Sequence, residues 1–191
     1  MNSEALSSSS ASGQNDRYHG VAQLLHWLMA LMIITMVVIG LFHEGWTDEV
    51  KGVTMRLHKS LGITVFALVL IRLGWRLTHK PPPYTPPLPA WQKTLATAVH
   101  WLFYALMIGL PIGGYLMSSG GSRPMLWFGV ELPKVPIERE SALWEMAHQG
   151  HSWGGYVMAG LIVLHITAAA YHLVSGFDNT VERMMPGGSS D

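Results

Sequence analysis

Residues 151–165 read HSWGGYVMAGLIVLH, an apolar stretch with a histidine at each end. The two histidines are 14 residues apart, close to four helical turns. On a helix they share a face and lie roughly 21 Å apart along the axis. An ionisable side chain inside an apolar span is costly and is functional by default. One helix therefore offers a candidate ligand near each surface of a membrane.

The composition indicates a membrane protein. Of the 191 residues, 49% are hydrophobic and 13% are charged, whereas an average soluble domain is roughly 25% charged. Four mostly apolar stretches are long enough to cross roughly 30 Å of hydrocarbon, namely residues 20–42, 55–77, 92–117 and 145–174. They predict an all-α integral membrane four-helix bundle within residues 17–186, embedded in a lipid bilayer.

The segments outside the bundle are polar. Residues 1–16 are serine-rich and lack a basic start before an apolar core, which predicts a disordered leader and not a signal peptide. Residues 187–191 are expected to form a short tail. The connection 80–91 is rich in proline, and the connection 118–144 is expected to lie outside the membrane with one partly embedded aromatic patch.

Charge predicts orientation and excludes one class of partner. The formal net charge is zero, so no nucleic-acid partner is indicated. Lysine and arginine near helix ends number six on each side of the predicted bundle. Because Arg72, Arg76 and Lys80 form a dense cluster on the side of the termini, we expect both termini to be cytoplasmic.

The sequence contains ten histidines and no cysteine. The absence of cysteine excludes disulfides, cysteine-ligated iron–sulfur clusters, thiolate-ligated haem and the covalent attachment of c-type haem. Any haem in this protein is therefore held without covalent attachment to the chain.

Every predicted span carries at least one histidine. Because successive helices alternate in direction, His26 and His165 share an inner depth, and His58 and His151 share an outer depth. Paired imidazoles across a bundle are what a six-coordinate haem iron requires, and such iron suits electron transfer. The pattern predicts two b-type haems, one bound by each pair.

His100 is the fifth spanning histidine, at the inner depth. It is a ligand that replaces one of the inner pair, a haem propionate partner or a hydrogen-bond donor to a quinone. Cations for the anionic propionates are available, because Arg56 and Lys59 flank His58 and Arg72 reaches the inner level. Small residues, among them Gly40 and Gly114, thin the helix faces where a macrocycle would lie.

Other interpretations of the histidines stay open. A single one of them is equally well explained by a hydrogen bond between helices. Zinc prefers a tight tetrahedron of four ligands, and two ligands on one helix are then three or four residues apart. Among the spanning histidines only His151 has such a neighbour, His148, three residues before it. A histidine-lined metal or proton transporter is a further class, although such proteins usually carry acidic residues in their spans.

Several strings together resemble the bacterial cytochrome b561 family, small di-haem quinone-linked membrane cytochromes. They are LLHW around His26, MRLHKSLG around His58, HWLFYALMIGLPIGGYLM from His100, GYVMAGLIVLH ending at His165, and FDNTVERMMP from residue 177 to 186. The resemblance implies a bacterial inner-membrane protein. It also implies that histidines of the first, second and fourth helices bind the haems, which here are His26, His58, His151 and His165.

The resemblance further implies electron exchange with ubiquinone and, for at least one family member, oxidation of superoxide at the outer face. Steering of an anion needs a positive field, yet residues 43–57 carry three acids against two bases and residues 118–145 carry four against three. A redox protein is another candidate donor. The alternative role is a membrane anchor subunit of a larger dehydrogenase or hydrogenase.

Overall fold

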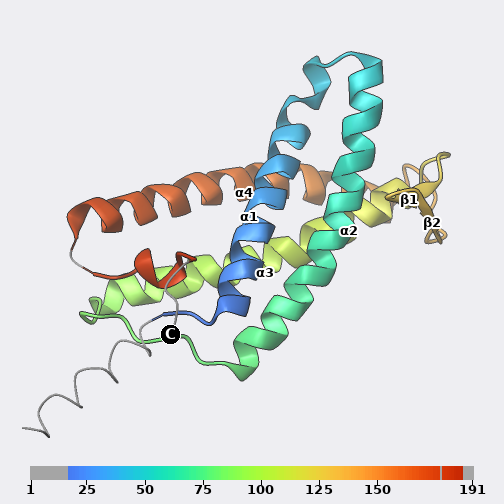
Figure 1. Ribbon diagram of the computed structural model, residues 1–191. Coiled ribbons are helices and arrows are strands. Elements are labelled where there is room, and N and C mark those ends of the chain that lie inside the picture. The colour runs from blue at the N-terminus through green and yellow to red at the C-terminus, as the bar shows by residue number, and fades with distance from the viewer. Residues whose placement is uncertain (1–16, 177, 187–191) are drawn as a thin grey trace, which may run out of the picture.

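The computed structural model describes residues 17–176 and 178–186, so the predicted leader (1–16) and tail (187–191) lie outside the described residues. Four long helices dominate (Figure 1), and each is long and apolar enough to span a membrane. The prediction of an all-α membrane four-helix bundle is confirmed. The elements in chain order are α1 (Gly20–Phe42), η1 (His43–Gly45), α2 (Asp48–Thr78), α3 (Ala90–Ser119), β1 (Met125–Trp127), β2 (Val130–Leu132), α4 (Ala142–Ser175) and η2 (Glu182–Met184).

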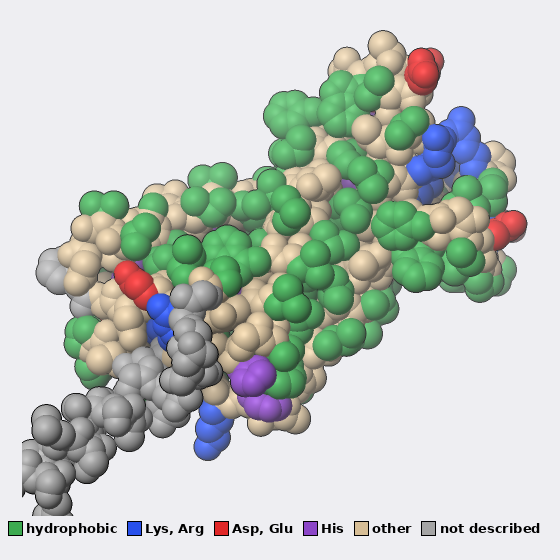
Figure 2. All heavy atoms as spheres, in the orientation of Figure 1, with side chains coloured by type: hydrophobic (Ala, Val, Ile, Leu, Met, Phe, Trp, Pro, Cys, Tyr) green, Lys and Arg blue, Asp and Glu red, His purple; other side chains and the backbone are tan. Residues whose placement is uncertain are grey.

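The helices form two antiparallel pairs. In one pair α1 packs on α2 and in the other α3 packs on α4, while α2 also packs on α3 and α1 on α4. Figure 1 shows the first pair crossing the second. Large apolar side chains cover much of the visible surface (Figure 2), as a bundle immersed in lipid requires because hydrocarbon replaces water around it.

Helix α2 begins at Asp48, before the apolar stretch that the sequence places at about residue 55. Asp48 and Glu49 occupy its first turn, where negative side chains are stabilised by the partial positive charge of the helix N-terminus. Helix α4 begins one residue after Ser141, whose hydroxyl accepts a hydrogen bond from the Trp144 amide. It ends at Ser175, and the next residue, Gly176, has the left-handed conformation (φ 62°), which favours glycine.

One end of the bundle carries a short β-hairpin, and we call it the hairpin face. Strands β1 and β2 pair antiparallel and are joined by Phe128 and Gly129, both with positive φ (45° and 93°). The indole of Trp127 donates to Thr64 on α2, and the Phe128 amide donates to the Ser60 hydroxyl. Sequence reasoning did not predict these strands, because each has only three residues and phenylalanine is rare at a turn position of this kind.

The opposite end, which we call the terminal face, joins both ends of the described chain. The Tyr18 amide donates to the Arg183 carbonyl, and the Trp27 indole donates to the Met184 carbonyl. The Arg183 side chain is 2% exposed and donates to the Pro82 carbonyl. Its guanidinium also lies over the rings of Tyr18 and Tyr84, at 5.3 and 4.4 Å from their centres. Residues 178–186 therefore tie α1 and the α2–α3 connection together.

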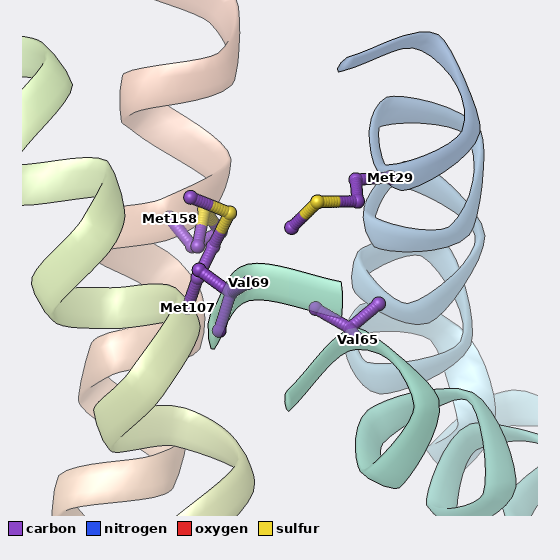
Figure 3. Close-up of a cluster of buried hydrophobic side chains, with 5 residues drawn as sticks. All are labelled: Met29, Val65, Val69, Met107 and Met158. Carbon is purple, nitrogen blue, oxygen red and sulfur yellow. The ribbon is translucent and has the colours of Figure 1, made fainter. Parts of the chain in front are cut away.

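The middle of the bundle is a layer of buried apolar side chains (Figure 3). It consists of Met29, Val65, Val69, Met107 and Met158, and we call it the middle layer. Met158 lies midway between His151 and His165, seven residues from each. The middle layer therefore separates the histidines of the hairpin side from those of the terminal side.

Candidate functional site

The structure brings the hairpin-side histidines together. His58 on α2 and His151 on α4 face each other with ring centres 5.9 Å apart and ring planes at 70°. The Nδ1 atom of His151 is 2.9 Å from the Leu110 carbonyl on α3. Because a carbonyl only accepts, His151 donates from Nδ1 and its Nε2 lone pair is left available. We call His58 and His151 the hairpin-side pair.

Three histidines gather on the terminal side. The ring centre of His165 is 6.2 Å from that of His26 and 6.0 Å from that of His100. The Nη2 atom of Arg72 is 3.3 Å from Nδ1 of His26. The structure therefore places these three histidines at one level, and we call them the terminal-side group. The ring distances of His26 and His100 from His165 differ too little to separate them as partners.

The histidine pairs fit a haem with two imidazole ligands. A metal–imidazole bond is about 2 Å long, so two imidazoles on opposite sides of one metal have ring centres roughly 6 Å apart. The Nδ1 atom of His58 is buried and has no hydrogen-bond partner within the described residues. A haem iron would bind this ring through Nε2 and would not pair Nδ1, so the fit rests on the spacing of the facing rings.

Two glycines stand directly against the hairpin-side pair. A Cβ on Gly114 would lie 3.0 Å from Cε1 and 3.2 Å from Nδ1 of His151, and a Cβ on Gly40 would lie 3.7 Å from Cε1 of His58. Sequence reasoning expected both glycines to thin the helix faces. The structure shows that a side chain at Gly114 would require the His151 ring to shift by a few tenths of an ångström.

The expected propionate cations differ in their surroundings. Arg56 lines a small cavity of about 270 Å³ together with Leu57, Ser60, Leu126, Phe128 and Gly129. Arg123 and Lys134 are the charged side chains that act on Lys59. Figure 2 shows a group of lysine and arginine side chains near the hairpin, with few acidic ones beside it. Arg72 contacts a histidine ring directly.

Other metal sites are not supported. Within residues 17–176 and 178–186, no group of three or more His, Cys, Asp or Glu side chains is arranged to hold a metal ion. His148 stacks on Trp144, with ring centres 5.0 Å apart, which gives this histidine a packing role. The zinc alternative therefore has no tetrahedral ligand set in the described part of the chain.

Sequence reasoning missed three contacts of the site. The Leu110 carbonyl, the Arg72–His26 contact and the His172–Asp178 hydrogen bond of 2.6 Å all depend on how neighbouring segments are rotated or folded back. Pro111 inside α3 is no signal for the first of these, because a proline frees the carbonyl four residues earlier, here that of Met107, and not that of Leu110.

Comparison with known proteins gives one consistent result. Residues 17–187 match the family described as prokaryotic cytochrome b561. Cytochrome b561 homolog 2 of Escherichia coli is 29% identical over 182 residues, which cover 92% of this chain and 95% of that protein. Cytochrome b561 homolog 1 of the same organism is 30% identical, over 90% of this chain and 98% of that protein.

A third relative has a more specific name. "Probable superoxide oxidase CybB" of Yersinia pestis is 29% identical over 175 residues, which cover 85% of this chain and 92% of that protein. The family match covers all the described residues, including every histidine of the two levels. A family of b-type cytochromes implies haem b, in agreement with the bundle and its facing histidines. The chain belongs to the prokaryotic cytochrome b561 family.

Proposed function

We propose that this protein is a di-haem cytochrome that accepts electrons at the hairpin face and passes them to ubiquinone in the bilayer. The observation that carries the proposal is the presence of two histidine levels, with facing rings 5.9 Å apart on one and 6.2 Å apart on the other. His58 and His151 hold one haem, and His26 and His165 hold the other. A bound haem supplies one-electron chemistry, because its iron alternates between the ferric and ferrous states.

The chain's own residues provide positioning and insulation. Leu110 fixes the orientation of the His151 ring, as a second partner of a ligating histidine does. The middle layer excludes water between the levels, because its five side chains are all buried. Acidic residues occur in the four helices only in the first turns of α2 and α4, so the spans lack the carboxylates typical of proton and metal transporters.

Superoxide is the donor that we propose at the hairpin face. The name of the Yersinia pestis relative supports it, and so does the cationic group formed by Lys59, Arg123 and Lys134. The charge totals of the two loops argue against steering of an anion, because both loops are slightly negative. A local cluster of cations can nevertheless attract an anion at the place where it lies. Two superoxide ions lose one electron each and leave as O₂, and one ubiquinone takes the two electrons and two protons to become ubiquinol.

Orientation follows from the same proposal. The hairpin face is periplasmic, and the terminal face, with both termini, is cytoplasmic. The protein lies in the inner membrane as a multi-pass protein, as its four apolar helices and its family indicate.

The direct test is stoichiometry. A pyridine haemochrome assay on the purified protein should return two haems b per chain, and the reduced-minus-oxidised spectrum should be that of low-spin haem. One haem per chain would contradict the proposal. The donor is tested separately, by ubiquinone reduction in a superoxide-generating system, with superoxide dismutase expected to abolish it.

The anchor-subunit alternative has its own discriminating result. An anchor for a larger dehydrogenase or hydrogenase should copurify with its partner and should be inactive alone. Purification as a lone haem protein with quinone-reducing activity would count against that role.

A further inference from the structure

The two histidine levels differ in the group that meets a ring nitrogen. At the hairpin side, Nδ1 of His151 meets the Leu110 carbonyl at 2.9 Å. At the terminal side, Nδ1 of His26 meets Nη2 of Arg72 at 3.3 Å. A carbonyl is neutral and only accepts, whereas a guanidinium is always charged and only donates. One level therefore has a neutral acceptor and the other a fixed positive charge.

The charge of Arg72 reaches the whole terminal-side group. Arg72 is among the charged residues that act on His26, His165 and His100. No ion pair between Arg72 and a carboxylate occurs among the described residues. Because Arg72 lies within an apolar span, its field is weakened less by solvent than that of a surface cation. Which of His26 and His100 faces His165 as a ligand does not alter this influence.

The cations of the hairpin side are held differently. Lys59 follows His58 directly in the chain, but its charged neighbours are Arg123 and Lys134, and within the described residues no cationic side chain donates a hydrogen bond to the ring of His58 or His151. The cation that contacts a histidine ring therefore belongs to the terminal side.

We propose that Arg72 is a positioning residue that makes the terminal-side haem the one with the higher redox potential. This inference rests on the proposed function, because it requires a haem at each level. Reduction lowers the positive charge of a site, so a nearby fixed cation favours the reduced form. A carbonyl that accepts from a ligating imidazole makes that imidazole more basic and favours the oxidised form. Both effects direct the electron from the hairpin side to the terminal side.

Haem binding also constrains Arg72. A neutral imidazole has one lone pair, and in the structure Arg72 occupies it at Nδ1 of His26. Coordination through Nε2 requires a proton on Nδ1, which cannot share a hydrogen bond with a guanidinium. Arg72 therefore releases His26 when that ring binds iron, while the position of its helix keeps the positive charge at the same level.

The test is a potentiometric titration of the haem-loaded, full-length protein, followed by its optical spectrum. The wild type should show two steps. Arg72→Gln removes the charge and offers an amide carbonyl like that of Leu110. It should lower the reduction equilibrium constant of the higher step at least tenfold, about 59 mV for one electron, and leave the lower step in place. Arg72→Lys keeps the charge, so its reduction equilibrium constant for the higher step should stay within about threefold of the wild-type value. The same is expected of Lys93→Gln, which eliminates an exposed charge at the terminal face.

A second variant shows which of the two levels has the higher potential. In His151→Ala the haem that is retained should titrate at the higher wild-type step. Two unchanged steps in Arg72→Gln, a shift of the lower step alone, or a retained haem at the lower step would each overturn the inference. If Arg72→Gln does not retain both haems, Arg72→Lys decides: a tenfold loss in that variant with both haems bound contradicts a role for the charge. A haemochrome assay that returns one haem in the wild type instead contradicts the proposed function.

Discussion

At the scale of single residues, the facing histidines dominate the chemistry of the site. The pairing of His58 with His151 places each ring against a partner on another helix, and Leu110 and Gly114 restrict the His151 ring from the third helix. The ring therefore has one neighbour that orients it, Leu110, and another, Gly114, that approaches it closely because it has no side chain.

Gly114→Ala should remove the hairpin-side haem. The new Cβ would lie 3.0 Å from Cε1 of His151, so the ring must move, although alanine itself favours a helix over glycine by about 1 kcal/mol. The haem-to-protein ratio should fall from two to one while the protein still inserts. Gly160→Ala is the matched control on α4, since among the described residues no atom outside the adjacent backbone of its own helix lies within 4 Å of its Cβ position. Equal haem content in both variants would contradict the crowding argument.

His151→Ala and His100→Ala should behave differently. His151 is the histidine of α4 whose ring faces His58, so its loss should leave one low-spin haem. His100→Ala should retain two low-spin haems and change only a redox potential or quinone reduction, because a partner outside the metal's ligand set tunes a site without forming it. Optical and EPR spectra measure the number and the spin state of the haems in both variants. Conversion of one haem to a five-coordinate high-spin form in His100→Ala would make His100 a ligand.

At the scale of elements, the segment after α4 holds the terminal face closed. Asp178 accepts hydrogen bonds from the Thr180 amide at 2.8 Å and from His172 at 2.6 Å. Burial raises the pKa of the Asp178 carboxyl, but these hydrogen bonds outweigh burial and hold the pKa below its usual range. The ionised carboxylate therefore stabilises the folded segment at neutral pH.

Asp178→Asn should destabilise the protein in a pH-dependent way. Hydrogen bonds to a charged group contribute about 1.5–3 kcal/mol, so we expect a loss of about 2 kcal/mol at neutral pH. A group with a lowered folded pKa stabilises the fold above its unfolded pKa, and this contribution is lost as the pH falls through the folded value. Thermal unfolding in detergent should show the difference from wild type shrinking below about pH 4. Glu182→Gln, which removes an exposed carboxylate of the same segment, should show only a small difference from the wild type.

The sequence was sufficient for the helices and for the levels of the histidines, and less so for what surrounds them. Apolar length predicts four spans, and the spacing of 14 residues between His151 and His165 predicts two levels on one helix. The sequence could not show whether His26 or His100 is the partner of His165, because the depth of a residue in the membrane does not determine the direction in which its ring points. The Leu110 and Arg72 contacts depend on helix rotation, which periodicity does not determine. The roles of these residues as ligands stay predictions.

The β-hairpin and residues 178–186 show the same limit of prediction from sequence, here for secondary structure and for contacts between distant segments. Strands of three residues carry too little alternation to be recognised. Arg183 appears in sequence as an ordinary charge of the C-terminal string, and only the folded chain places it between Tyr18 and Tyr84.

At the scale of the whole molecule, the two ends of the bundle differ in composition and in structure. One end gathers the cations of the hairpin face, and the other joins residue 18 to residue 183 through backbone hydrogen bonds. These two ends are what a topology experiment must place on opposite sides of the membrane.

Orientation can be measured cleanly because the chain has no cysteine. Single cysteines at Glu138→Cys, in the connection that carries the hairpin, and at Lys80→Cys, between α2 and α3, each introduce one exposed thiol. In intact bacterial cells, a membrane-impermeant maleimide should label the first and not the second, and lysis should expose both. The reverse pattern would place the termini in the periplasm.

The distance between the histidine levels has a consequence for an energised membrane. His151 and His165 are 14 residues apart on one helix, so a charge that moves between their levels travels roughly 21 Å, about two thirds of the hydrocarbon thickness. In the proposed orientation an electron moving toward the cytoplasm moves against the membrane potential, at a cost of about 1.6 kcal/mol for each 100 mV. The charge of Arg72 acts in the opposite direction, and the protein would work as an electrogenic element whose rate falls as the cell's voltage rises.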